Sequence, residues 1–369
     1  GFIASMKILL LSAYDAASHI YWRKGLVAHL PEHQWTVLTL PGRYFSWRMR
    51  GNSMSWAFSE YEPLSQSYDL VIATSMTDLS ALRGFVPSLA NTPTLVYFHE
   101  NQFAYPSSGK EFKSVEPCIL NLYTALAADY CLFNSEYNRR TLLEGARALL
   151  GKLPDHVPAG LPERLEKRSA VMPVPLSEDS FLPHRPETTQ FTMTWNHRWE
   201  YDKNPQLLLD SMALLCDAGV AFKLHVVGQQ FRKVPKQFDA LHTLLAERRG
   251  HWGYMHSRSA YQQLLQQSDV VLSTALHDYQ GIAVLEGAAA GALPVVPDRL
   301  AYTELFPERC RYSEEKEAEA LALFLTELIG HKASEGRLDG VDVTHLSWTV
   351  MADHYRRIIQ QVASGERID

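Results

Sequence analysis

Short apolar runs alternate with longer amphipathic segments along the first half of the chain. "KILLLSA" at 7–13 has the length and composition of a buried strand, and in "SHIYWRKGLVAHL" at 18–30 apolar residues recur at the three- and four-residue spacing of an amphipathic helix. Further near-continuous apolar runs lie at 35–40, 68–75, 92–100 and 128–135. Strands that are apolar on both faces are typical of a parallel sheet covered by helices. The first half therefore predicts a parallel sheet.

The same alternation restarts after a proline-rich stretch. The segment "SAVMPVPLSEDSFLPHRPETTQ" at 169–190 has little periodicity and is interpreted as a linker. Strands are expected at 191–197, 222–228, 268–275 and 292–297, with a helix that begins near Pro205 and ends before Gly219. Residues 347–363 have helical spacing again.

Two successive βαβ sets predict an α/β protein with two Rossmann-like, doubly wound domains that face each other across a cleft. We expect an N-terminal domain at 6–170, a linker at 171–190, a second domain at 191–340, and a C-terminal helix at 341–369 that packs back on the first domain. Ligands of such sheets bind beyond the carboxyl ends of the strands. Polar residues that follow strands are therefore the candidate site residues.

Composition adds limits to this interpretation. The chain has 369 residues with 46% hydrophobic and 21% charged positions, which is typical of a globular protein. The net charge of −6 divides into about +1 for residues 1–170 and −7 for residues 171–369, so a polyanion is expected to prefer the first half. The four cysteines are far apart and indicate free thiols. The first apolar run is too short to span a membrane, and we expect a cytoplasmic protein.

The stretch "LHDYQGIAVLEGAAAG" at 276–291 is the first candidate site. It places Asp278 in a loop, Gly281 at a tight turn, and Glu286 over one turn into a helix expected from about Ile282 to Ala290. The free amides at a helix N-terminus bind phosphate, and carboxylates accept hydrogen bonds from hydroxyls. The stretch therefore indicates a sugar-nucleotide site. The alternative is that both acids only cap or solvate a surface helix.

Cations and histidines follow other strands. Arg198 and Lys203 flank a turn in "WNHRWEYDKNP" at 195–205, where they can stabilise a departing diphosphate or can simply be solvated. In the first half, His19 follows the first strand and His99 follows another, as does Asn134. A lone histidine at a strand edge is more often structural than functional, but here two such histidines are expected to face the same cleft, so both interpretations stay open.

The stretch "GRYFSWRMRGNSMSW" at 42–56 interleaves arginines with aromatic residues. Arg43, Arg48 and Arg50 can meet phosphates while Trp47 and Trp56 stack on splayed bases, as in recognition of single-stranded RNA. The alternatives are a packed aromatic loop or one that faces a membrane.

Taken together, these residues resemble the retaining GT-B glycosyltransferases of the glycosyltransferase 4 type. The hallmark of that group is an acid, seven residues and a glutamate, with an upstream Arg and Lys; Asp278 stands where the group usually has Glu. The first half resembles more closely the glycosyltransferase-like domain-containing protein 1 family of tRNA-queuosine α-mannosyltransferases. The matching stretches are "SH" at 18–19, "RYFSWRMR" at 43–50, "YFHENQFAYP" at 97–106 and "FNSEYN" at 133–138. Ala16 and Ala17 replace the glycine pair of that subgroup.

The resemblance implies transfer of mannose from GDP-mannose to queuosine in a tRNA anticodon, with retention and without a metal or other cofactor. It implies catalytic roles for His99, Arg198, Lys203 and Asp278. The implied donor-binding residues are Ser18, His19, Asn196, Tyr254, Tyr279, Gln280, Gly281, Ile282 and Glu286. The implied acceptor-binding residues are Arg43, Trp47, Arg48, Arg50, Glu100, Asn101 and Asn134. A lipid or saccharide acceptor, or an inactive module that binds sugar nucleotides, remain the alternatives.

Overall fold

The computed structural model describes residues 5–104, 114–183 and 188–365. The chain divides into two compact units: unit 1 contains the described residues up to Pro175 and from Trp348 onward, and unit 2 runs from Leu176 to Ser347. The division falls inside the stretch interpreted as a linker, and residues 176–183 belong to unit 2. Tyr105 and Pro106 of the "YFHENQFAYP" stretch and positions 184–187 of the linker stretch lie outside the described residues.

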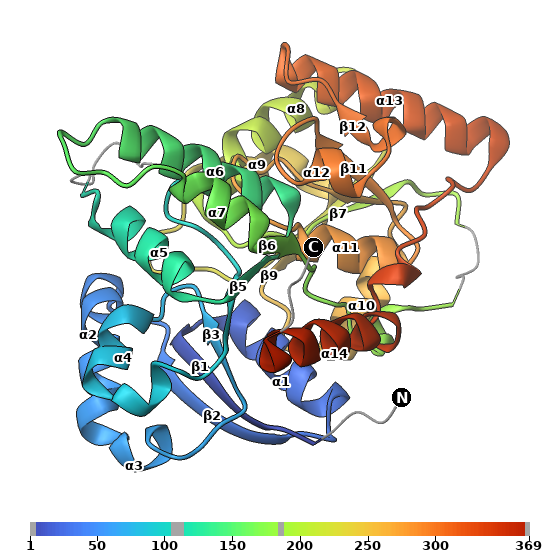
Figure 1. Ribbon diagram of the computed structural model, residues 1–369. Helices are drawn as coiled ribbons and strands as arrows, with labels where there is room; N and C mark the ends of the chain where they lie inside the picture. Colours follow the sequence, from blue (N-terminus) through green and yellow to red (C-terminus); the bar gives the residue numbers. More distant parts are fainter. Residues whose placement is uncertain (1–4, 105–113, 184–187, 366–369) are drawn as a thin grey trace. The chain divides into compact units, whose positions relative to one another are not determined.

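Unit 1 is built on a six-stranded parallel sheet in the order β2-β1-β3-β4-β5-β6. The strands are β1 (Lys7–Asp15), β2 (Gln34–Pro41), β3 (Leu70–Thr74), β4 (Thr94–Phe98), β5 (Tyr130–Phe133) and β6 (Ser169–Val171). The helices are α1 (Ala17–His29), α2 (Phe45–Ser59), α3 (Tyr61–Leu64), α4 (Leu79–Phe85), α5 (Glu116–Ala127), α6 (Glu136–Gly151), α7 (Leu161–Lys167) and α14 (Trp348–Ser364). Figure 1 shows α2 and α4 on one face of this sheet and α1 and α14 on the other. β3 and β4 are buried along their whole length, as their apolar runs predict.

Unit 2 repeats the plan with a second six-stranded parallel sheet in the order β12-β11-β10-β7-β8-β9. The strands are β7 (Thr192–Trp195), β8 (Lys223–Val227), β9 (Arg249–Gly253), β10 (Val270–Leu272), β11 (Leu293–Pro297) and β12 (Arg311–Tyr312). The helices are α8 (Pro205–Asp217), α9 (Gln237–Leu245), α10 (Arg258–Gln266), α11 (Ile282–Ala289), α12 (Tyr302–Leu305) and α13 (Glu317–Glu335). Two Rossmann-like α/β units confirm the predicted fold class.

Local sequence explains where the helices of unit 2 begin and end. The Asn204 side chain accepts a hydrogen bond from the Leu207 amide and Pro205 occupies the first helical position, so α8 starts where the Asn-Pro pair predicts. α11 lies between Gly281 and Gly291, which both have positive φ angles, of 71° and 102°. Glycine adopts this left-handed conformation without the penalty that a Cβ imposes.

Each sheet packs over its own apolar core. The core of unit 2 includes Trp195, Met212, Val271 and Val295, and that of unit 1 includes Leu9, Val71, Phe98 and Phe133. Helix α14, the last of the described helices, joins unit 1: the Trp22 indole donates to the Tyr355 hydroxyl, and Trp348 stacks on His29. The four cysteines are free thiols.

Candidate functional site

Gly281 forms the turn between β10 and α11 in unit 2. A Cβ atom there would lie 2.8 Å from Cε1 of the Tyr302 ring, so both the φ angle and the close approach require glycine. Gly281, the residue before the first turn of α11, has no side chain of its own to cap that turn. The first amides of a helix have no partner within the helix, so they are suited to an anionic ligand.

Asp278 holds this turn in place. Its Oδ1 accepts a hydrogen bond from the Gly281 amide at 2.9 Å, and its Oδ2 accepts one from the Tyr302 hydroxyl at 3.1 Å. Burial alone would raise the pKa of Asp278, but the Lys203 ammonium, 3.9 Å away, and the two hydrogen bonds lower it below its usual range. Asp278 is therefore an ionised acid that braces the turn. Its side chain is one methylene shorter than the glutamate that the resemblance implies at this position, and both of its oxygens accept hydrogen bonds.

Lys203 and Arg198 lie in different surroundings. The Lys203 ammonium is buried, donates to the His277 carbonyl at 2.8 Å, and lies 3.8 Å from Asp202. The Arg198 side chain is half exposed, and among the described residues it forms a 3.5 Å ion pair with Glu200. Lys203 is thus a fixed charge of the site, whereas Arg198 can turn toward a ligand.

A buried hydrogen-bond chain runs from the end of β7 to Asp278. His197 Nε2 lies 2.7 Å from Ser273 Oγ, which lies 2.8 Å from the Tyr302 hydroxyl. Burial, with Lys203 next, lowers the pKa of His197 to about 3, so its imidazole is neutral at physiological pH. Because an ionised Asp278 can only accept, Tyr302 donates to it and must accept from Ser273. Ser273 in turn accepts from His197, which assigns the proton of the imidazole to Nε2.

Glu286 on α11 belongs to a separate group of charges. It lies 4.0 Å from Arg258 of α10, which binds both carboxylate oxygens of Asp179, at 2.9 and 3.0 Å. Burial raises the pKa of Glu286 to about 7, an effect that Arg258 opposes and Asp179 adds to. Hydrogen bonds from Arg258 lower the pKa of Asp179. Arg258 therefore neutralises the charge of Glu286 less than it neutralises the charge of Asp179.

The remaining predicted donor residues of unit 2 divide by exposure. Asn196 Nδ2 donates to the Tyr261 hydroxyl and to the Ala283 carbonyl, both at 2.8 Å, and so ties the end of β7 to α11. Its Oδ1 is buried and accepts no hydrogen bond from the described residues. Tyr279 and Gln280 are buried beside Gly281, Ile282 is partly buried, and Tyr254 is exposed after β9.

In unit 1, two histidines meet at the carboxyl edge of the sheet. His19 Nε2 lies 3.0 Å from a Glu100 carboxylate oxygen, and the His19 ring stacks on His99 with centroids 4.1 Å apart. Burial, with the neighbouring His19, lowers the pKa of His99 well below its usual range, so His99 is neutral. Ser18 is exposed beside them. Both histidines follow strands, as the sequence predicts, and the structure brings them together.

Asn101 and Asn134 form the frame behind these histidines. Asn101 is fully buried: its Oδ1 accepts from the Phe103 and Ala104 amides, and its Nδ2 donates to Asn138 and Thr141. Asn134 Nδ2 donates to the His99 carbonyl at 2.9 Å. In this conformation both side chains are used inside the protein, which corrects their assignment as acceptor-binding residues.

The stretch at 42–56 differs from its sequence-based interpretation. It is mostly helix, because α2 begins at Phe45. Trp56 is 1% exposed and Arg48 is 9% exposed, so the expectation that Trp56 stacks on bases and that Arg48 meets phosphate is wrong. Arg43 lies over the Tyr44 ring at 5.7 Å, and Trp47 and Arg50 are about half exposed. These three stay available to a ligand.

Sequence reasoning did not single out several residues that the structure brings to the site. Tyr302 and Ser273 brace Asp278, while Asp179 and Arg258 set the charge around Glu286. Ser273 follows β10 directly, so its place at a strand end was a usable signal. Tyr302 and Asp179 lie far from the motifs in sequence and had no such signal.

A phosphate-suited helix start, a buried ammonium and two carboxyl groups at the edge of a parallel sheet, in a chain of two Rossmann-like units, define a GT-B glycosyltransferase. Comparison with known families agrees: a model of the tRNA-queuosine alpha-mannosyltransferase N-terminal region matches residues 7–176, and one of glycosyl transferases group 1 matches residues 178–335. The chain is 30% identical over 321 residues to a tRNA-queuosine alpha-mannosyltransferase of Drosophila melanogaster, covering 84% of each. The chain belongs to the tRNA-queuosine alpha-mannosyltransferase family and is a hexosyltransferase.

More distant proteins share the fold or part of the sequence. A GDP-mannose-dependent alpha-(1-6)-phosphatidylinositol dimannoside mannosyltransferase of Mycobacterium tuberculosis is 28% identical over 139 residues, 38% of this chain and 35% of that protein. The sucrose-phosphate synthase of Thermosynechococcus elongatus has a TM-score of 0.72 at 13% identity, covering 98% of this chain and 100% of that one. The catalytic domain of Arabidopsis thaliana starch synthase IV has a TM-score of 0.68 at 10% identity, with coverage of 98% and 100%. Among the described residues, none of the helices combines the length and hydropathy needed to cross a bilayer.

Proposed function

We propose that this protein transfers mannose from GDP-mannose to queuosine in a tRNA anticodon, with retention of the anomeric configuration. The observation that carries the proposal is the arrangement of Lys203, Asp278 and Gly281 at the start of α11. In the same chain, residues 7–176 match the model of the tRNA-queuosine alpha-mannosyltransferase N-terminal region. A tRNA substrate also favours a cytoplasmic location.

Unit 2 is the proposed donor site. The amides of the first turn of α11, from Ile282 onward, and the Lys203 ammonium bind the diphosphate, and Arg198 turns in to complete its neutralisation. Glu286 accepts hydrogen bonds from the ribose hydroxyls, and Asp278 with residues 279–282 holds the sugar. Asn196 and the exposed Tyr254 add contacts to the nucleoside, and Ser18 and His19 of unit 1 are further donor contacts.

The chemical step depends on the charge that develops on the leaving diphosphate. Lys203 and Arg198 neutralise that charge, so we propose that no metal or other cofactor is required. His99 is neutral and buried at the edge of the unit 1 sheet, where we propose that it lies beside the reacting face of the sugar. A chelator should therefore leave turnover unchanged.

The acceptor is assigned to unit 1. Arg43, Trp47 and Arg50 offer two guanidinium groups and an indole on or next to one helix, α2, a combination that suits phosphates and stacked bases. Glu100 can accept from a hydroxyl of the cyclopentenediol. A lipid acceptor is the second candidate, since the mycobacterial relative is a phosphatidylinositol dimannoside mannosyltransferase.

The decisive experiment supplies GDP-mannose, or UDP-glucose as a separate arm, with tRNA that contains queuosine and with matched tRNA that lacks it. Nucleoside mass spectrometry should find one hexose added to queuosine from GDP-mannose alone. Lys203→Ala should lower turnover about 100- to 1,000-fold, the usual cost of one lost transition-state donor. Lys233→Ala, at an exposed position of unit 2, is the control. Mannose on vesicle lipid, with none on tRNA, would contradict the proposal.

A further inference from the structure

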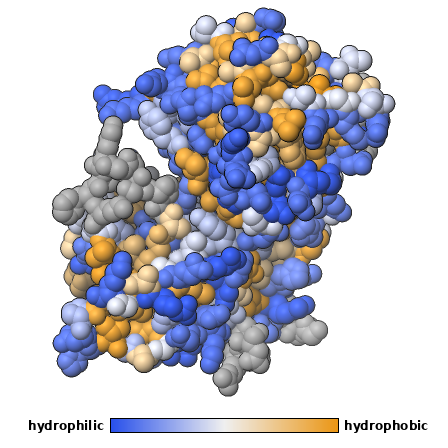
Figure 2. Space-filling model, turned by 90° about the horizontal axis from the view of Figure 1, so that it is seen from above, coloured by the Kyte–Doolittle hydropathy of each residue, from blue (hydrophilic) through white to orange (hydrophobic). Residues whose placement is uncertain are grey.

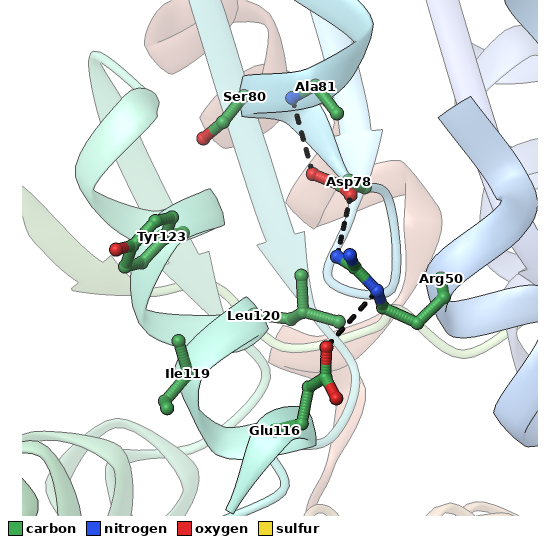
Figure 3. A pocket seen from close by; sticks show the side chains of 8 residues that line it. All are labelled: Arg50, Asp78, Ser80, Ala81, Glu116, Ile119, Leu120 and Tyr123. Atoms are coloured by element: carbon green, nitrogen blue, oxygen red, sulfur yellow. Dashed lines mark hydrogen bonds and ion pairs between the residues drawn. The ribbon is translucent and has the colours of Figure 1, made fainter. Parts of the chain in front are cut away.

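A pocket of about 450 Å³ opens in unit 1, away from the paired histidines. Its walls come from α2, from the start of α4 and from one face of α5, as Figure 3 shows. This volume is within the range of pockets that bind small molecules, and the pocket lies by the loop that follows β3 at the carboxyl edge of the sheet. The lining residues are Arg50, Asp78, Ser80, Ala81, Glu116, Ile119, Leu120 and Tyr123.

The charges that line the pocket are unequal. Asp78 and Glu116 supply two carboxylates, and Arg50 is the one cation among the lining residues. The Arg50 guanidinium points between them in Figure 3, 3.1 Å from Glu116 and 3.8 Å from Asp78. Asp78 is buried and also caps α4 by accepting from the Ala81 amide. One negative charge is thus left for a ligand of charge +1 to balance.

Apolar side chains of α5 complete the pocket. Ile119, Leu120 and Tyr123 lie three, four and seven residues after Glu116, so they share one face of α5 with it. The Tyr123 ring lines the same pocket and is more than half exposed, and an aromatic ring attracts an organic cation through its π face. Such a wall suits a ligand with a hydrocarbon frame better than it suits a metal ion.

We propose that this pocket binds an alkylammonium group on a small carbon frame, and that in the reaction this group is the protonated secondary amine of the acceptor's modified base. This identification of the ligand rests on the proposed function. The amine donates to Glu116 and Asp78, and the attached ring packs on Leu120 and Tyr123. Arg50 stays between the two carboxylates and balances the other negative charge.

The pocket consequently distinguishes queuosine from guanosine at the same tRNA position. Guanosine has no ammonium group, so it leaves the carboxylates paired only with Arg50. Two charge-assisted hydrogen bonds at a partly exposed site give a preference of roughly tenfold in affinity.

The test measures equilibrium binding of the full chain to two tRNAs that differ only in queuosine or guanosine at the anticodon. The wild-type protein should bind the queuosine form about tenfold more tightly. Glu116→Gln, which keeps the shape of the side chain, should reduce that ratio toward one while affinity for the guanosine form is unchanged or slightly higher. Glu163→Gln is the matched control, because Glu163 is an equally exposed acid of unit 1 that pairs with Arg147 instead.

The outcomes separate this inference from the proposed function. Mannose transfer to queuosine with an unchanged binding ratio in Glu116→Gln overturns the pocket assignment and leaves the function standing. Absence of transfer by the wild-type protein overturns the function. Asp78→Asn gives a second measurement, and its melting temperature shows whether loss of the α4 cap has unfolded the protein. A folded Asp78→Asn protein that keeps the full ratio counts against the pocket as well.

Discussion

The Tyr302 side chain supports the candidate donor site in two ways. Its hydroxyl binds Asp278, and its ring occupies the space that a side chain at Gly281 would need. Ser273 and His197 extend the support back to the end of β7. Because Tyr302, Ser273 and His197 are all buried and hydrogen-bonded, they fix the acid and the helix start together.

Tyr302→Phe tests this support. The change removes one donor from the ionised Asp278, so the Asp278 pKa should rise and catalytic efficiency with the donor should fall about tenfold. The proposed role of Asp278 requires the ionised acid, so activity should be lost at a higher pH on the acid side, while Lys203 and His197 still face Asp278. Tyr312→Phe is the control, because it removes another buried phenol that donates to the Ser273 carbonyl. An acid limb that moves equally in both variants would show a general effect on stability.

Glu286→Gln should make the protein more stable but less active. The raised Glu286 pKa means that the folded protein holds this proton more tightly than the unfolded chain does. This tighter binding of the Glu286 proton stabilises the folded protein in full below pH 4.5, and the stabilisation is lost as the pH rises through about 7. The raised pKa corresponds to roughly 3 kcal/mol as an upper figure, so the Gln variant should be more stable by up to that much at pH 8 and equally stable at pH 4. Urea unfolding at both pH values checks this. If the wild-type protein and the Gln variant were equally stable at pH 8, Glu286 would ionise in the folded protein without a cost in free energy.

At the scale of elements, α1 and α14 meet through a glycine. A Cβ on Gly25 would lie 2.3 Å from Cζ2 of Trp348, so the absence of a side chain is what lets the indole lie across α1. Trp348 also stacks on His29, one turn further along the same helix. The last helix is therefore anchored to the first by a specific fit as well as by apolar area.

Gly25→Ala should destabilise unit 1, although alanine favours helices. The added methyl group must push Trp348 away, and overpacking of this kind costs about 1–3 kcal/mol. Gly84→Ala in α4 is the matched control, because nothing lies within 4 Å of its Cβ position and the change should be neutral or stabilising. Unfolding in urea gives both values. A Gly25→Ala protein as stable as the Gly84→Ala protein would mean that the indole can move aside freely.

The elements also show what the sequence could predict. Strands with continuous apolar runs, such as β3 and β4, are where the pattern places them, and α8 and α11 begin at the turns that Asn204 and Gly281 indicate. Helix α2 was not recognised, because its aromatic and arginine residues mask the helical period and its buried polar Asn52 binds the Met76 carbonyl. Arg48 and Trp56 were therefore placed on a surface where they do not lie.

At the scale of the whole molecule, the sequence could predict two α/β units and the residues that directly follow strands. Lys203, Asp278 and Gly281 are close in space as expected, because parallel strands deliver their following loops to one edge. The partners of those residues could not be predicted, since Tyr302 and Arg258 reach the site from helices whose packing depends on the complete fold.

Figure 2 shows apolar patches scattered among polar residues on the one face it presents. Exposed aromatic residues therefore mark a binding surface only where other features, such as the arginines of α2, accompany them.

The order of helices along the chain has a consequence for biosynthesis. Unit 1 includes both the first strand and α14, with all of unit 2 translated between them. While unit 2 is being translated, Trp22 and Tyr97 lack their contacts with Tyr355, which has not yet been synthesised. The unit whose first strand is synthesised first is thus the unit that finishes folding last, and a nascent chain that ends before residue 348 leaves these aromatic side chains without that cover.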